Sequence, residues 1–202
     1  MEQLSLFAEQ GQSPGLPATL LDYHPGLFTE TESELILQKL IRESPWQQRV
    51  VKMYDKQVLT PRLTAWYADP ETYDYTSLRR SVPNTWTPDL LLIKNRVEAI
   101  VGLKFNSVLL NYYRDGNDSV AWHSDNERAL GTHPVIASVS FGQLRCFDIR
   151  KKQDHRQRYS IKLESGALMV MKGDLQVDWE HRIAKSSKPM KARLNLTFRV
   201  VI

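Results

Sequence analysis

The sequence predicts a mainly β domain, an antiparallel sandwich or barrel, preceded by a region with two helices. Six short runs rich in β-branched and aromatic residues follow Gly102, separated by turn residues. The two clearest helical patterns both lie before Gly102. The 202 residues are enough for one domain with a substantial core and too few for two enzymatic domains. We therefore expect a helical N-terminal part and a β-rich C-terminal core.

The first 19 residues have the composition of a tail, and the expected domain spans residues 20–202. The segment "EQGQSPGLPAT" carries few apolar residues. Before it stands "QLSLF", which resembles the short peptide by which many bacterial DNA-processing proteins dock on the replication sliding clamp. A terminus without a partner is the alternative interpretation. If the resemblance is functional, the contacts come from Gln3, Leu4, Leu6 and Phe7.

Composition excludes several classes of protein. No apolar run approaches the ~20 residues of a membrane-spanning helix, and the N-terminus lacks the features of a secretory signal, so we expect a cytoplasmic protein without a membrane partner. The single cysteine, Cys146, cannot form an internal disulfide or a cysteine-based zinc site. A net charge of +4 favours a polyanionic partner only if the cations are clustered. One such cluster, "RKKQDHRQR" at 150–158, fits either a solvated hairpin or a phosphate contact.

The two helices have recognisable starts. Thr31-Glu32-Ser33-Glu34 fits a capping box and precedes apolar residues at helical spacing. The second helix opens with Thr87 and Pro88 and stops at Gly102. Both are expected to be scaffold.

The six expected strands lie in "FNSVLLNYY", "PVIASVSFG", "LRCFDIR", "RYSIKLE", "GALMVMKGD" and "ARLNLTFRVV". Alternate residues of a strand share a face. The last run therefore has one apolar face and one polar face, the latter made of Arg193, Asn195, Thr197 and Arg199. A polar face usually meets water, but in a barrel with a working interior it lines the cavity. Two arginines in such an interior would require anions.

His123 and Asp125, in "VAWHSDNE", are two residues apart in an extended segment and can direct a nitrogen and an oxygen at one point. This is half of a metal site, and a third ligand is needed. The chain offers His24, His133, His155 and His181, of which His181 is favoured because it precedes the arginine-bearing strand. Two His and one carboxylate suit nonheme Fe(II) that activates O2. Zinc hydrolases use similar ligands, but would leave the arginines without a role.

"NYYRDGNDSVAWHSDNE", then His181, then "RLNLTFR" strongly resemble the AlkB family of Fe(II)- and 2-oxoglutarate-dependent nucleic-acid demethylases. "PRLTAWY" and "YDYT" extend the likeness upstream, so that it covers about residues 20–202. The resemblance implies a double-stranded β-helix, or jelly roll, at 103–202. It also implies helices and a nucleotide-recognition lid at 20–102.

Carried over, the resemblance implies that Fe(II) is held by His123, Asp125 and His181. Arg193 would bind the distal carboxylate of 2-oxoglutarate, and Arg199 would lie near its metal-bound end. Further 2-oxoglutarate contacts would come from Asn111, Tyr113, Asn195 and Thr197. O2 is the remaining co-substrate.

The resemblance also implies a flipped substrate base. Tyr75 would stack on it, with Tyr73 as an accessory contact, and Tyr54 would fill the gap in the duplex beside Lys56; ordinary packing is the alternative for these tyrosines. Other substrate-side candidates are Asn126, Glu127 and Arg145. Two positions depart from the family pattern: Asn126 replaces a common acidic residue, and "LQVDWEHRI" lacks the polar or histidine-rich residues expected before His181.

The function that follows is repair of N-alkylated bases such as 1-methyladenine and 3-methylcytosine in DNA, with release of formaldehyde. One alternative is the same chemistry on RNA, protein or a small molecule. Another is a barrel-shaped binding module without turnover. We expect a monomer, because the sequence contains no assembly element.

Overall fold

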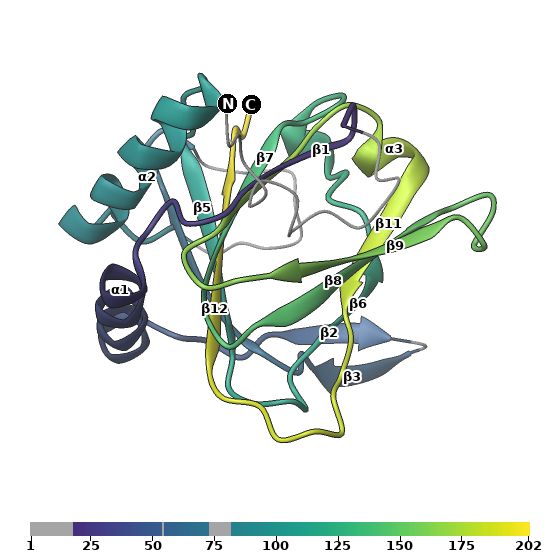
Figure 1. The fold of residues 1–202 in the computed structure, drawn as a ribbon, viewed down its shortest axis with the longest axis horizontal. Helices are drawn as coiled ribbons and strands as arrows, with labels where there is room; N and C mark the ends of the chain where they lie inside the picture. The colour runs from purple at the N-terminus through teal and green to yellow at the C-terminus, as the bar shows by residue number, and fades with distance from the viewer. Residues whose placement is uncertain (1–17, 54, 73–81) are drawn as a thin grey trace, which may run out of the picture.

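The computed structural model describes residues 18–53, 55–72 and 82–202, which form two β-sheets, a separate hairpin and a few helices (Figure 1). The helical segments are α1 (Glu30–Glu43), α2 (Pro88–Val101), the 3-10 turn η1 (Arg128–Leu130) and α3 (Leu175–Asp178). The strands are β1 (Leu21–His24), β2 (Val50–Met53), β3 (Lys56–Leu59), β4 (Leu63–Ala68), β5 (Ser107–Tyr113), β6 (Val120–His123), β7 (Ile136–Gly142), β8 (Arg145–Lys151), β9 (Arg158–Leu163), β10 (Leu168–Met171), β11 (Trp179–Ile183) and β12 (Arg193–Arg199).

The two sheets form a jelly roll, as expected. The major sheet has the order β1-β10-β7-β12-β5-β4, and the minor sheet has the order β6-β11-β8-β9. All pairings between these strands are antiparallel. Strands β2 and β3 pair only with each other and lie near the β6 side of the minor sheet (Figure 1).

The strands before Gly102 were not predicted individually. β1 and β4 form the two edges of the major sheet, where they pair with β10 and β5. They are short, with four and six residues, and their β conformation depends on partners that follow at least 39 positions later in the chain. Local pattern is therefore a weak signal for them.

Helix α1 begins two residues earlier than the sequence prediction. The capping box is Thr29 with Glu32, not Thr31 with Glu34: the Thr29 side chain accepts from the Glu32 backbone, and Glu32 accepts from the Thr29 backbone. The Thr-x-x-Glu pattern occurs twice in overlap, and only Thr29 has the extended backbone of a cap. Helix α2 begins after Thr87 with Pro88 in its first turn and ends at Gly102 in the left-handed conformation, as predicted.

Two apolar cores lie on opposite faces of the major sheet. One packs α1 and α2 against the outer face and includes Leu90, Ile93 and Phe198, each fully buried. The other fills much of the space between the sheets and includes Ile149, Met169 and Leu175. The inner face of the major sheet is therefore apolar at β10, while at β12 its residues are polar.

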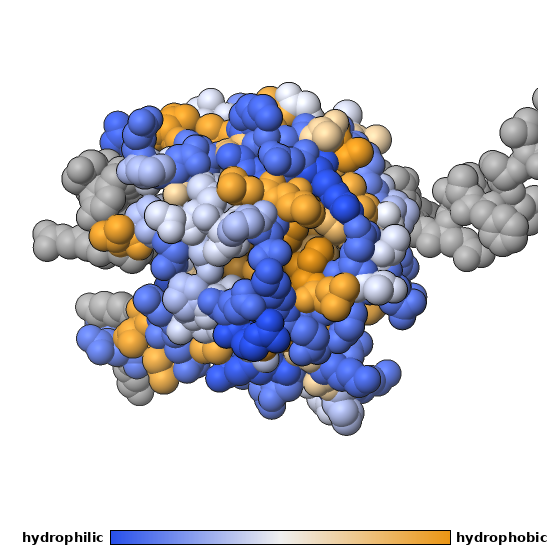
Figure 2. Space-filling model, turned by 90° about the vertical axis from the view of Figure 1, so that its left-hand side faces the viewer, coloured by the Kyte–Doolittle hydropathy of each residue, from blue (hydrophilic) through white to orange (hydrophobic). Residues whose placement is uncertain are grey.

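The helix-bearing side is largely hydrophilic with interspersed apolar patches (Figure 2). The exposed large apolar side chains of α1 and α2 are Leu35, Leu91, Leu92 and Ile100. None of the helices in the described part of the chain has the length and apolar content needed to cross a membrane.

Candidate functional site

The register of β6 and β11 places two histidines side by side. His123 and His181 are direct cross-strand partners, and their ring centroids are 4.2 Å apart. His181 is buried, with the Phe147 ring 4.9 Å away. Residues that are 58 positions apart in the sequence are thus brought to the same point by antiparallel pairing.

Asp125 completes the group. Its Oδ1 lies 3.6 Å from Nε2 of His123, and the ligand atoms of His123, Asp125 and His181 all lie within 4.8 Å of one another. Among the described residues, His24, His133 and His155 belong to no such group of three. The donor set and its spacing fit a single metal ion.

The loop that carries Asp125 is fixed to the segment that carries His181. The backbone N–H of Asp125 donates to Oε1 of Gln176 at 2.8 Å, and Gln176 is buried on α3. The Ser124 hydroxyl donates to the Trp179 carbonyl at 2.8 Å. These two bonds hold the His123/Asp125 segment against the start of β11.

The protonation states suit metal binding. Burial raises the pKa of Asp125, but the charges of Arg199 and the two histidines outweigh this and lower it to about 2. Burial is the main cause that lowers the pKa of His181 to about 3. Asp125 is therefore ionised and His181 neutral at pH 7, the forms in which these groups bind metals.

The group lies at one end of a cavity of about 100 Å³ between the two sheets. The polar face of β12 lines this cavity and is largely shielded from bulk water: Arg193 and Thr197 are buried, and Asn195 and Arg199 are partly buried. The alternate side chains Leu194, Leu196 and Phe198 pack under the helices. β12 therefore has two buried faces of opposite polarity.

Arg193 has unused hydrogen-bonding capacity. Its NH2 group donates to the Ser140 hydroxyl at 2.9 Å, whereas Nε and NH1 are buried without a partner. Its guanidinium lies 5.1 Å from the Tyr113 ring centroid, and its burial lowers its pKa. A buried cation with free donors is costly unless an anion binds it, so the cavity fits a carboxylate at this end.

Three other polar residues of the cavity already make hydrogen bonds. Arg199 donates to Oδ2 of Asp125 at 2.9 Å, although its Nε has no partner. Asn195 donates to the Ser138 hydroxyl at 2.7 Å, and Thr197 donates to Oδ1 of Asn195 at 3.4 Å. Buried Nδ1 of His181 has no partner. The unsatisfied atoms thus occur at both ends of the cavity, beside the metal ligands and at Arg193.

Arg62 is a cavity residue to which the sequence analysis gave no role. Its Nε donates to Oδ1 of Asn111 at 2.7 Å, and its NH1 donates to the Ser119 carbonyl at 3.4 Å. It lines both the inner cavity and the groove outside it. The sequence could have indicated this position. Alternate residues of a strand share a face, so in "PRLTAWY" Arg62 and Thr64 lie on the same face, just at the start of β4.

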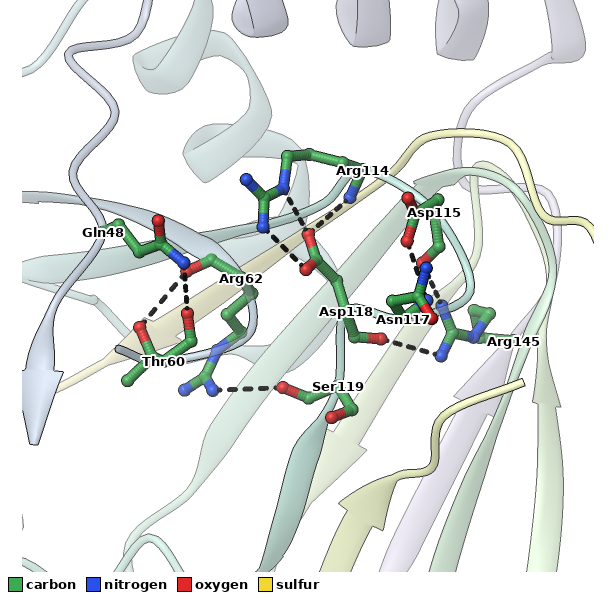
Figure 3. Close-up of polar contacts among 9 residues, drawn as sticks. All are labelled: Gln48, Thr60, Arg62, Arg114, Asp115, Asn117, Asp118, Ser119 and Arg145. Carbon is green, nitrogen blue, oxygen red and sulfur yellow. Dashed lines mark hydrogen bonds and ion pairs between the residues drawn. The ribbon is translucent and has the colours of Figure 1, made fainter. Parts of the chain in front are cut away.

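A polar network supports the loop before β6 (Figure 3). Asp118 is buried and accepts three hydrogen bonds from Arg114, two from the side chain and one from the backbone. Gly116 allows the loop to approach the 186–188 segment, because a Cβ there would lie 2.7 Å from the Ser186 carbonyl oxygen. This loop leads directly to His123.

The structure gives Arg145 a place in this network and not in the cavity lining. Arg145 is 3% exposed and donates to the carbonyls of Asp115 and Asp118 at 3.1 and 3.0 Å (Figure 3). It also donates to the carbonyl of Ala184 at 2.6 Å. The substrate contact predicted for Arg145 therefore does not fit its surroundings. The alternation of faces along β8 does not indicate which neighbouring loop accepts the hydrogen bonds of Arg145.

The remaining substrate-side predictions have different outcomes. Glu127 is exposed and lines the mouth of the cavity, whereas Asn126 is exposed and not in its lining. Tyr54, Tyr73 and Tyr75 lie outside the described residues, as do Gln3, Leu4, Leu6 and Phe7 and the side chain of Lys56. Their roles stay predictions.

Comparison with known proteins gives consistent results. Residues 21–199 match the family model described as the 2OG-Fe(II) oxygenase superfamily. The chain is 43% identical to the alpha-ketoglutarate-dependent dioxygenase alkB homolog 3 of Rattus norvegicus over 188 residues, which are 88% of this chain and 63% of that protein. It is 34% identical to the DNA oxidative demethylase ALKBH2 of Homo sapiens, with 87% and 71% covered. The chain thus spans less than two thirds of the alkB homolog 3 protein.

Among solved structures, the fold is similar to that of OsALKBH1. The TM-score is 0.64 at 16% sequence identity, with 91% of this chain and 99% of that chain covered. At this identity the likeness concerns the fold, and it agrees with the jelly roll described above.

Proposed function

This chain belongs to the AlkB-like dioxygenases of the 2OG-Fe(II) oxygenase superfamily, and on that basis we propose that it demethylates N-alkylated bases in DNA. The observation that carries the proposal is the pairing of a His-Asp-His group with Arg193, a buried arginine whose donors are unused, inside one cavity. The first part fits Fe(II), and the second fits the distal carboxylate of 2-oxoglutarate.

The metal ligands and Arg199 have defined tasks in this proposal. His123, Asp125 and His181 would hold the iron. Nδ1 of His123 lies 2.9 Å from the Ala121 carbonyl, a contact that orients the ring and leaves Nε2 free to bind the metal. Arg199 keeps Asp125 ionised and oriented through its 2.9 Å hydrogen bond.

Arg193 would bind the diacid through its free Nε and NH1 donors. A planar guanidinium can bind a carboxylate with two parallel hydrogen bonds, which a lysine cannot do. The Ser140 hydroxyl, at 2.9 Å from NH2 of Arg193, fixes the orientation of the guanidinium. The guanidinium that would hold the co-substrate is thus oriented before the co-substrate binds.

With iron, O2 and 2-oxoglutarate bound, the site would supply the oxygen atom that hydroxylates an N-methyl group, with succinate and CO2 as co-products. The hydroxymethyl group then leaves the base as formaldehyde. The target base must leave the helical stack to reach the cavity, at a cost of a few kcal/mol in a duplex. Glu127, at the cavity mouth, places a carboxylate where a cationic methylated base would enter.

The test is an incubation of the iron-loaded protein with 2-oxoglutarate and oligonucleotides that contain 1-methyladenine or 3-methylcytosine. We expect the unmodified base and one formaldehyde for each base repaired, and no product from the His181→Ala variant. Parallel reactions use single-stranded DNA, duplex DNA, RNA and a methylated peptide. Turnover only on RNA or peptide would move the function to that substrate. Absence of succinate under all conditions would favour a binding module.

A further inference from the structure

The pairing of β6 with β11, which brings the two histidines of the metal site together, is irregular. From His181 to Ile183 the chain of β11 advances two residues, whereas the paired positions on β6, His123 and Val120, are three residues apart. β6 therefore carries one extra residue, as in a β-bulge. A slip of one residue in a strand turns its side chains to the opposite face of the sheet. The orientation of His123 thus depends on contacts that fix the ends of this strand pair.

One end of the pair is held by the contacts around Asp125. The Asp125 N–H donates to Gln176, just before β11, and the Ser124 hydroxyl donates to the carbonyl of Trp179, the first residue of β11. Both contacts follow the last residue of β6. The opposite end, where β6 begins and β11 ends, lies on the other side of the bulge and needs a contact of its own.

The guanidinium of Arg145 joins the two strands at this opposite end. Its NH2 group donates to the carbonyl of Asp118, two residues before β6, at 3.0 Å, and to the carbonyl of Ala184, directly after β11, at 2.6 Å. Its NH1 group donates to the Asp115 carbonyl at 3.1 Å (Figure 3). One planar group therefore connects the segment that enters β6 with the segment that leaves β11.

Arg145 is itself held firmly in place. It is the first residue of β8, the strand that pairs with β11 on the side away from β6. Its guanidinium lies 5.8 Å from the Tyr113 ring centroid, and its charge interacts with the buried carboxylate of Asp118. A guanidinium presents several donors in a fixed plane, whereas a lysine presents one ammonium group. Arginine is therefore the side chain best suited to serve three carbonyls at once.

Arg114 provides a comparison within the same loop. Its side chain donates to the Asp118 carboxylate at 2.7 and 2.9 Å, and its backbone N–H donates to the same carboxylate. Within the described part of the chain, these hydrogen bonds stay inside the loop and do not reach β11. Arg114 thus stabilises the loop before β6, while Arg145 connects that loop to the second histidine-bearing strand.

We propose that Arg145 is a positioning residue of the metal site: its three carbonyl contacts fix the register of β6 against β11 and thereby the spacing of His123 and His181. The inference rests on the iron site of the proposed function, to which it adds a residue that contacts neither the metal ligands nor the substrate. Loss of these contacts should weaken metal binding and alter the arrangement of the ligands.

Titration of the metal-free full chain with Co(II), followed by visible absorption, tests the proposal, because the spectrum of Co(II) reports the geometry of its ligands as well as the affinity. Arg145→Met keeps an apolar stem and removes the donors. We expect about 10-fold weaker Co(II) binding, the lower end of the range for lost supporting bonds, and a changed spectrum. Arg145→Lys should recover part of the affinity, since it keeps the charge and can donate to some of the carbonyls.

Two control variants separate positioning from stability. Arg114→Met removes a guanidinium from the same loop, and Phe198→Leu removes packing from the outer core. Both should bind Co(II) with the affinity and spectrum of the wild type while folded. Amide hydrogen exchange of the metal-free protein gives a second measurement. Arg145→Met should accelerate exchange in β6 and β11, and Arg114→Met should accelerate it only in the loop before β6.

Wild-type Co(II) affinity and spectrum in folded Arg145→Met would overturn the proposal. An equal loss in Arg145→Met and either control would also overturn it, because the effect would then come from general stability. If Arg145→Met does not fold, Arg145→Lys decides: weaker Co(II) binding than in Arg114→Met supports the proposal, and wild-type binding overturns it. Failure of the wild type to bind Co(II) would instead remove the metal site, and with it both the proposed function and this inference.

Discussion

The two faces of β12 are both largely buried and differ in how well their groups are satisfied. On the outer face, Leu194, Leu196 and Phe198 are fully buried in the core beneath the helices. On the inner face, Arg193 is 1% exposed and has two donor atoms without partners. The contrast shows that burial alone does not identify a stabilising residue: one face holds the fold together, and the other is kept incomplete for a ligand.

The largest loss of stability is expected for a substitution on the outer face of β12. Phe198→Ala removes a ring that lies 6.1 Å from Phe105 and 6.4 Å from Trp86, centroid to centroid. The cavity left behind should lower the free energy of unfolding by about 3–5 kcal/mol, as measured by urea denaturation. The folded fraction should bind Fe(II) and 2-oxoglutarate normally. A large loss of ligand affinity in folded Phe198→Ala would break the division between the two faces.

A substitution on the inner face of β12 should weaken ligand binding and change stability little. Arg193→Leu removes the free donors, and we expect about 100-fold weaker 2-oxoglutarate binding, the equivalent of ~2.7 kcal/mol for one partner of a buried charge pair. The ligand-free protein should lose little stability, because the side chain it loses is a buried, poorly satisfied cation. Calorimetric titration gives the affinity and urea denaturation the stability. Unfolding of the ligand-free variant would show instead that Arg193 is structural.

Gln176 lies between the two regions, buried like a core residue but bonded to the metal-ligand loop. Gln176→Leu introduces an apolar side chain of similar size and removes the acceptor of the Asp125 N–H. Supporting bonds of this kind change metal affinity by about 10–100-fold, and we expect a loss in that range in a titration with Fe(II) or Co(II). Gln38→Leu, at an exposed position of α1, is the control. Equal metal affinity in both variants would make Gln176 a packing residue only.

Asp118 tests the loop before β6 through the pH dependence of stability. Its burial raises its pKa, but the Arg114 hydrogen bonds outweigh this and lower it below the usual range. A lowered pKa contributes stability above about pH 4 that disappears as the pH falls through the folded value. Asp118→Asn should therefore lose about 2 kcal/mol at pH 7, and this difference should shrink as the pH falls below 4. A pH-independent difference in the urea midpoint would contradict the assignment.

The sequence predicted the parts of the molecule that depend on local pattern. The alternation in "RLNLTFR" placed Arg193 and Arg199 on one face of a strand, and Thr87, Pro88 and Gly102 located the limits of α2. The position of His181 before the arginine-bearing strand favoured it as the third ligand, and the resemblance to a known family then implied the full set. The register between β6 and β11, which pairs His181 with His123, could not be read from local pattern.

The missed features depend on tertiary neighbours. Arg62 contacts Asn111, 49 positions away, and Gln176 contacts Asp125, 51 positions away. Arg145 was a candidate substrate contact, whereas three backbone carbonyls of distant loops take up its donors. Pattern within one segment reports which face a side chain occupies, and not which distant group meets it there.

The most direct test of the account is an anaerobic titration of the metal-free protein with Fe(II) and then 2-oxoglutarate, followed by calorimetry. The account predicts one Fe(II) per chain, 2-oxoglutarate binding that depends on the metal, and loss of the second event in Arg193→Leu but not in Phe198→Leu. Binding of 2-oxoglutarate with equal affinity in wild type and Arg193→Leu would contradict the claim that the inner face of β12 is the ligand-binding face.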